Sequence, residues 1–325
     1  MSAWEDGMGS LVKGTSLRAA LLVSASVMSL AAASPEVRAA DLPARPMYTK
    51  AAPIEPTPLW TWYLEGGAFN TSGGTLFGLA ETKARPGWEG AVGLDYRIAA
   101  TPWHISAQFR YGKSRERNSA VSGYFTAPGI GYGYGATVNG NLNHKESHAV
   151  ADFAVGHDIG IGTGQAQLKF GVRVVDLSAK STLTGTLYVP TIEGSNSGPG
   201  VISFESRFVG AGPRGSIEGS QPIAGAWAID YMGGVAYLYG TRSLNVTASA
   251  PGLGSGAFGI SDVTGIFNAD ASLGLSYGFS RTAKLTAGYR YDGYWGAMKM
   301  FDSNLNVVNN DRAYYGPFLR FTGAF

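Results

Sequence analysis

Ten segments of about ten residues, each alternating between apolar and polar side chains, dominate this chain of 325 residues. The segment Trp103–Gly112 is typical, because Trp, Ile, Ala, Phe and Tyr occupy one phase and His, Ser, Gln, Arg and Gly occupy the other. Side chains of a β-strand point to opposite faces in turn, so each segment predicts a strand with one apolar and one polar face. A tilted strand of about nine to eleven residues crosses a bilayer. The pattern therefore predicts membrane-spanning strands with a lipid-facing and a water-facing side.

The predicted strands are separated by connections that are short and long in turn. The strands run from Trp60 to Asn70, Trp88 to Ile98, Trp103 to Gly112, His148 to Asp158, Gln165 to Asp176, Ile202 to Gly215, Ala226 to Tyr239, Ile266 to Phe279, Ala283 to Tyr294 and Ala313 to Phe325. Short connections are expected at 99–102, 159–164, 216–225 and 280–282, and long ones at 71–87, 113–147, 177–201, 240–265 and 295–312. Outer-membrane barrels have short periplasmic turns and long extracellular loops. We therefore predict an all-β, transmembrane antiparallel up-and-down β-barrel of about ten strands, within a range of about eight to twelve.

The last predicted strand ends on Phe325, after an alternating stretch that begins at Tyr315. This ending is typical of bacterial outer-membrane barrels. We expect the barrel-assembly machinery to recognise this strand, and the alternation of connections places both ends of the barrel sequence in the periplasm.

Aromatic residues gather at both ends of the predicted strands. Such rings prefer the two membrane–water interfaces, where they form girdles around a barrel. The predicted girdle residues are Trp60, Trp62, Trp88, Trp103, Tyr111, Trp227, Tyr237, Trp295, Phe321 and Phe325. A soluble core is the alternative, and the lack of a helical pattern to pack on these rings disfavours it.

The amino-terminal region has the pattern of an export signal. Lys13 and Arg18 precede an apolar stretch, Ala19–Ala33, and small residues suit cleavage after Ala39. We predict a signal peptide at 1–39, with translation beginning at Met1 or Met8, a Pro-rich periplasmic tail at 40–59 and the barrel at 60–325. The expected location is the outer membrane of a Gram-negative cell.

The polar phase of the strands predicts a charged lumen. The expected lumen-lining residues are Glu65, Glu89, Asp95, Arg97, Arg110, Asp152, Lys169, Arg173, Glu205, Arg207, Asp230, Asp270, Lys284, Arg290, Asp292 and Arg320. Acidic and basic residues are equal in number, so they either pair and brace the wall or line a hydrated passage. We predict a porin-like protein that passes ions or small polar solutes through a narrow lumen. A closed structural or adhesive barrel, whose loops bind lipopolysaccharide or cell surfaces, is the alternative.

Other function classes find less support in the sequence. The chain has no cysteine, and its net charge of +2 does not indicate nucleic-acid binding. His104, His144 and His148 have charged neighbours, but their spacing matches no recognisable catalytic or metal site. We therefore expect no cofactor, no metal and no enzymatic activity, although acidic and histidine residues at an external rim leave an outer-membrane enzyme open.

The expected partners are membrane lipids, and the formation of homo-oligomers is left open. A basic cluster of Lys113, Arg115 and Arg117 follows the third predicted strand and is either a lipopolysaccharide contact or a solvated face. The Gly/Tyr-rich stretch 123–135 either folds into the lumen or forms an exposed loop or hairpin above the membrane.

Several segments carry a family resemblance. They are GAVGLDYR at 90–97, TPWHISAQFRYGKS at 101–114, FGVRVVDL at 170–177, FESRFVGAGPR at 204–214, FNADASLGLSYGF at 267–279 and YRYDGYWGAM at 289–298. Together they resemble the pore-forming outer-membrane proteins typified by the Legionella major outer membrane protein. The stretch ADLPARP at 40–46 resembles outer-membrane proteins of alphaproteobacteria. The resemblance implies a porin-like barrel without catalytic residues, but ten strands are fewer than in general-diffusion porins.

Overall fold

The computed structural model describes residues 58–76, 80–81, 83–126, 135–161, 164–191, 194–250, 254–302 and 306–325. The predicted signal peptide, and all of the predicted Pro-rich tail except its last two residues, lie outside these ranges. Within them, no helix is long and apolar enough to cross a membrane.

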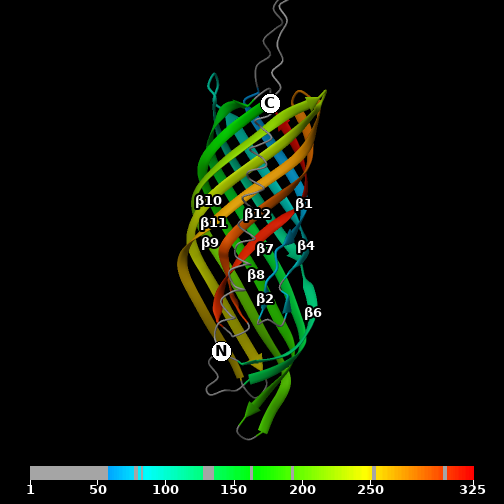
Figure 1. Ribbon diagram of the computed structural model, residues 1–325, viewed down its shortest axis with the longest axis vertical. Coiled ribbons are helices and arrows are strands. Elements are labelled where there is room, and N and C mark those ends of the chain that lie inside the picture. The colour runs from blue at the N-terminus through cyan, green and yellow to red at the C-terminus, as the bar shows by residue number, and fades with distance from the viewer. Residues whose placement is uncertain are drawn as a thin grey trace, which may run out of the picture.

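The described chain is built almost entirely of antiparallel strands (Figure 1). They are β1 (Trp60–Thr71), β2 (Thr75–Leu76), β3 (Ala80–Glu81), β4 (Arg85–Arg97), β5 (Trp103–Arg115), β6 (Arg117–Thr126), β7 (Gly135–Ile161), β8 (Gly164–Thr191), β9 (Gly194–Ala224), β10 (Trp227–Ala250), β11 (Gly254–Ser280), β12 (Ala283–Phe301) and β13 (Val307–Ala324). The short connections and the carboxyl end lie at one end of the molecule, and the β8–β9 hairpin extends at the other (Figure 1).

A single 11-stranded sheet closes on itself into a barrel. Its order is β5-β4-β1-β13-β12-β11-β10-β9-β8-β7-β6, and an additional pairing of β5 with β7 closes the ring. β6 continues the course of β5 along β7 after a break at Glu116, so β6 is not a further member of the closed ring. The predicted up-and-down barrel, with each of its ten strands, is confirmed.

The register turns charged side chains inward and apolar side chains outward. Where β1 pairs with β13, Glu65 lies opposite Arg320 on the inner face and Leu64 lies opposite Phe321 on the outer face. Leu64 is 56% exposed, whereas Glu65 is 8% exposed. An exposed apolar belt around a charged interior is the arrangement that a lipid environment favours.

Most of the predicted long connections are in fact strand, which is a correction to the sequence analysis. β8 continues through Thr191 and β9 begins at Gly194, so 177–201 is largely a paired hairpin. The same holds for most of 113–147, 240–265 and 295–312, and the expected turn at 216–225 is strand up to Ala224. Within 123–135, the described ends pair as part of the β6–β7 hairpin, and residues 127–134 lie outside the described chain.

The polarity of the two faces reverses along these strands, which explains the error. In the first half of β8 the outward residue Phe170 is 63% exposed, but further along it is Leu177 and Leu183 that point inward and are buried. Their neighbours Lys180 and Thr182 point outward. Beyond the membrane the outer face meets water, and the inner face can be apolar. The alternation with apolar residues on the outer face therefore stops at the membrane boundary, although the strand continues.

Two apolar layers pack inside the barrel, one at the ends of the predicted membrane strands that lie away from the short turns, and one beyond these ends. One contains Phe69, Val150, Val175, Leu177, Ala179, Phe208, Ala236, Leu238, Ile266, Tyr294, Ala297, Met298 and Tyr314. The other contains Val121, Val138, Leu142, Leu183, Ile202, Phe204, Leu244 and Phe301. The ring of Phe208 packs over Gly210, where a Cβ atom would lie only 2.6 Å from its Cζ atom. Glycine at this position lets the ring lie flat against the inner wall.

An ion-pair cluster anchors the base of the β10–β11 hairpin. Arg242 donates to Asp262 at 3.2 and 2.7 Å and to the carbonyl oxygen of Gly296, which belongs to β12. Lys299 lies 3.3 Å from the same Asp262 carboxylate. The hydrogen bonds from Arg242 hold the pKa of Asp262 below its usual range. The hairpin is thereby tied to the neighbouring strand.

Candidate functional site

Arg173 is the centre of a charge lattice inside the membrane-spanning part of the barrel. Its side chain is 1% exposed and donates two hydrogen bonds of 2.7 Å to Asp152 on the adjacent strand. It also donates to Asp270 at 2.9 Å and to Asn268 at 2.7 Å. Both of these residues lie on β11, which is separated from β8 by β10 and β9 in the ring. Arg214 adds a second bond to Asp270, at 2.8 Å.

A second set of contacts spans the lumen from β5 to β12. Arg110 forms a salt bridge with Asp292, and three strands separate β5 from β12 around the ring. Asn268 donates to Asp292 at 2.7 Å and Tyr294 donates to it at 3.0 Å. These groups come from several sides of the barrel and meet inside it at this level.

Arg290 joins the lattice to the carboxyl-terminal strand. It contacts Glu65 at 2.5 and 2.9 Å and Glu89 at 2.9 Å, and Arg320 donates to Glu65 at 2.8 Å. A small cavity of about 10 Å³ lies beside Phe69, Glu89 and Arg290. That volume is about the minimum needed by a single water molecule.

Nearer the short turns several lumen side chains are more exposed. His104 lies 2.7 Å from Asp95 and 2.9 Å from Asp158, and Arg97 pairs with Asp158 at 2.6 Å. The Arg97 and Asp158 side chains are 32% and 29% exposed. Lys284 also pairs with Asp230 at 2.7 Å and is 34% exposed. These groups form a charged vestibule that leads to the buried lattice.

On the far side of the first apolar layer lies a buried polar cluster. Arg312 on β13 lies 3.3 Å from Glu146 on β7, and three strands separate these two around the ring. His144 connects Glu146, at 2.9 Å, to Ser181, at 2.8 Å. Although serine, imidazole and carboxylate stand in a chain, each is at most 6% exposed. We assign the cluster to packing of the lumen.

The predicted lumen residues lie on the inner face, with two exceptions. Glu205 and Arg207 point outward, and Arg207 is 50% exposed and pairs with Asp176 at 2.6 Å. The prediction of an inward position is therefore wrong for these two residues. They lie in the extended half of β9, where the apolar phase, represented by Phe204 and Phe208, faces the lumen.

Several charged lumen residues are not among those that the sequence predicts. Arg214 and Glu218 occupy the inward phase of β9, and Glu218 forms a salt bridge with Lys169. The polar phase of 214–220 is the signal for these two residues, and it continues into the predicted turn at 216–225. Glu146 and Arg312 lie in the predicted long connections 113–147 and 295–312.

The predicted girdle residues lie on the outer face in two rows. Trp60 and Tyr96, with ring centroids 4.6 Å apart, and Trp227 and Tyr277, 4.9 Å apart, belong to the row at the short turns. In the other row, the ring centroids of Trp88 and Tyr111 are 5.7 Å apart. Trp295, also in that row, packs against Phe267 with ring centroids 5.3 Å apart.

A family model described as the Legionella pneumophila major outer membrane protein precursor matches residues 69–324. The chain belongs to this family. The protein is therefore an outer-membrane barrel. The predicted family and location are confirmed.

No curated protein matches the sequence. Solved structures that resemble it include the outer membrane protease OmpT from Escherichia coli, with 10% identity, a TM-score of 0.46 and coverage of 85% of this chain and 99% of that one. A major outer membrane protein from Thermus thermophilus has 12% identity and a TM-score of 0.36, covering 82% of this chain and 99% of that one.

Proposed function

We propose that this family member is a closed outer-membrane barrel that acts as a structural platform for rigid extracellular β-hairpins. One observation carries the proposal: Arg173, Arg110 and their partners connect opposite sides of the lumen and are nearly excluded from solvent. A passage for solutes would require these groups to be hydrated. We further propose that the protein is not an enzyme, since its buried histidines are held by neighbouring groups within the packed lumen.

The paired hairpins support the platform role. β8 and β9 remain in register from Gln165–Ser220 to Thr191–Gly194, and β10 and β11 remain paired to Ala250–Gly254. The paired strands of these hairpins continue well beyond the outer girdle. An apolar layer packs between the hairpins. The hairpins therefore form a stiff projection from the membrane.

A narrow ion pore is the second candidate, and the charged vestibule favours it. Arg97, Asp158 and Lys284 are partly exposed and would attract ions to the periplasmic mouth. In this case the Arg110–Asp292 contact would have to open as a gate. Discrete conductance steps would distinguish the pore from the closed platform.

The display of the hairpins is tested by labelling single cysteines, because the chain contains none of its own. Ser249→Cys, in the β10–β11 hairpin, is expected to react on intact cells with a maleimide that cannot cross membranes. The matched variant Ser280→Cys, at a short turn, should react only after the outer membrane is permeabilised. Equal labelling of the two on intact cells would contradict the proposed orientation.

A further inference from the structure

A basic surface lies on the outer face just beyond the extracellular girdle. Arg85 on β4 lies directly opposite Arg115 on β5, and Lys145 on β7 lies directly opposite Lys180 on β8. Like charges in directly opposed positions destabilise a sheet. Glu205 lies opposite Lys180, but Arg85, Lys113, Arg115 and Lys145 make no ion pair with a carboxylate in the described part of the chain. The described part of the chain supplies no anion to these four side chains, so the arrangement favours an external one.

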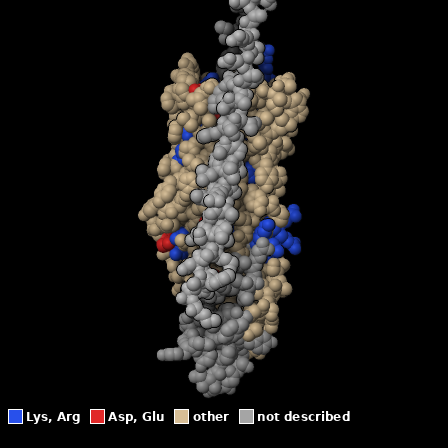
Figure 2. All heavy atoms as spheres, in the orientation of Figure 1, with Lys and Arg blue, Asp and Glu red and all other residues tan. Residues whose placement is uncertain are grey.

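The height of this surface points to the lipid headgroups. Lys113 lies two residues beyond Tyr111 on the same outward face, and Tyr111 contacts Trp88 of the girdle. On the membrane side, Phe109 and Val92 are 48% and 47% exposed and continue the apolar face. Figure 2 shows Lys and Arg side chains gathered where the largely uncharged band ends, on the side where Figure 1 labels β4 and β6. Cationic side chains and acyl-chain contacts therefore adjoin on one surface.

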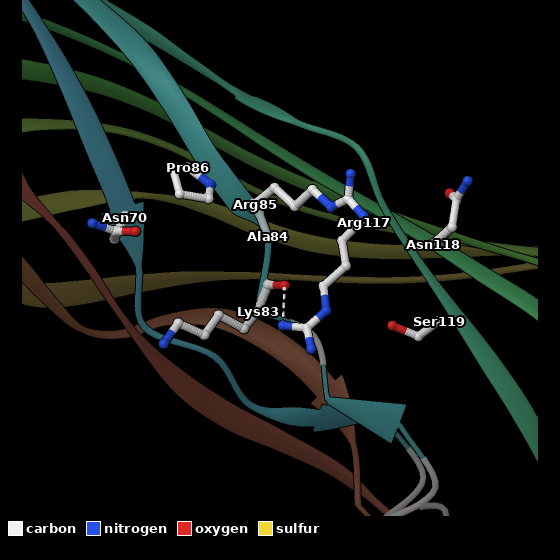
Figure 3. Close-up of a pocket in the computed structure, with 8 residues that line it drawn as sticks. All are labelled: Asn70, Lys83, Ala84, Arg85, Pro86, Arg117, Asn118 and Ser119. Atoms are coloured by element: carbon white, nitrogen blue, oxygen red, sulfur yellow. Dashed lines mark hydrogen bonds between the residues drawn. The ribbon is translucent and has the colours of Figure 1, made fainter.

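A cavity of about 490 Å³ opens beside the basic surface. Lys83, Arg85 and Arg117 line it, while Asn70, Asn118 and Ser119 contribute amide and hydroxyl groups (Figure 3). No carboxylate is among its lining residues in the described chain. The guanidinium of Arg117 donates to the carbonyl oxygen of Lys83 at 3.4 Å, which connects β6 to the segment before β4. The volume falls within the range of about 300–1,000 Å³ that is usual for small-ligand sites.

We propose that this basic surface and cavity bind the phosphorylated sugar headgroup of lipopolysaccharide in the outer leaflet. Arginine forks match phosphate oxygens in pairs, so a phosphate between Arg85 and Arg115 would relieve their repulsion. The sugar would occupy the polar cavity, and the acyl chains would lie along Trp88, Phe109 and Val92. Binding at this outward site does not depend on whether the lumen is open or closed.

The test compares the full-length mature protein with two variants that fold equally, as judged by heat-modifiable migration and circular dichroism. The triple variant Arg85→Gln, Lys113→Gln, Arg115→Gln removes the unpaired cations. Arg207→Gln is the control, because it removes an exposed outward cation that Asp176 already neutralises. Binding is measured with phosphatidylcholine vesicles that contain lipopolysaccharide or, separately, phosphatidylglycerol.

The wild type and Arg207→Gln are expected to prefer lipopolysaccharide vesicles, and the triple variant to bind them roughly a hundredfold more weakly, at about 1 kcal/mol for each lost cation. Millimolar inorganic phosphate should not displace the lipid. The proposal is overturned if the triple variant binds like the wild type, if phosphatidylglycerol binds equally well, or if inorganic phosphate alone displaces the lipid.

Discussion

Replacing Arg173 by Ala is expected to lower the free energy of unfolding by about 3–5 kcal/mol. The change leaves Asp152 and Asp270, which are 5% and 1% exposed, as buried carboxylates without their main partner. Removing one member of a buried ion pair has this large effect because the remaining charge keeps its cost of desolvation. The measurement is urea unfolding of the protein in phospholipid vesicles, followed by tryptophan fluorescence.

The matched control is Arg207→Ala. Arg207 also forms a two-pronged contact with an aspartate, but the side chain is 50% exposed on the outer face. We expect it to change the free energy of unfolding by only about 0–1 kcal/mol. If Arg173→Ala lowered the free energy of unfolding as little as this control, the charged groups around Arg173 would be hydrated. That result would contradict the closed lumen.

Replacing Phe208 by Ala is expected to lower the free energy of unfolding by about 3–5 kcal/mol. Phe208 is fully buried in the apolar layer inside the barrel. Truncation removes its packing against the inner wall and leaves a cavity that the rigid sheet cannot close. In a water-filled pore the same inward ring would be solvated, so its loss would cost little. The same unfolding experiment measures the effect.

Phe258→Ala is the comparison for this change. Phe258 lies in the extended part of β11, and its side chain is 51% exposed. Truncating it should alter the free energy of unfolding by less than about 1 kcal/mol, since surface changes outside special features are usually small. Equal effects at Phe208 and Phe258 would mean that the inner layer is not packed.

The membrane-spanning part of the fold could be predicted because lipid imposes one polarity on it. In β5, the residues from Trp103 to Gly112 alternate without interruption, and the structure turns the apolar phase outward as expected. The extension has no such constraint. Around Phe204 and Phe208 the apolar phase faces inward, and this reversal is why Glu205 and Arg207 were assigned to the wrong face.

The partners across the lumen could not be predicted from the sequence. Arg110 and Asp292 are 182 positions apart, and their contact depends on the tilt and stagger of every strand between them. The alternation of one strand gives only the direction of a side chain. The balanced charges left pairing and a hydrated passage both open, and they did not indicate that Arg173 would hold Asp152 and Asp270 together.

The most direct test of the closed lumen is the conductance of single barrels in a planar lipid bilayer. The mature wild-type protein is inserted after its folding has been verified by heat-modifiable migration. The cross-lumen contacts of Arg110 and Arg173 predict a baseline current without discrete steps over the ordinary range of voltage. Reproducible, uniform conductance steps from the folded protein would contradict the closed barrel and establish the pore.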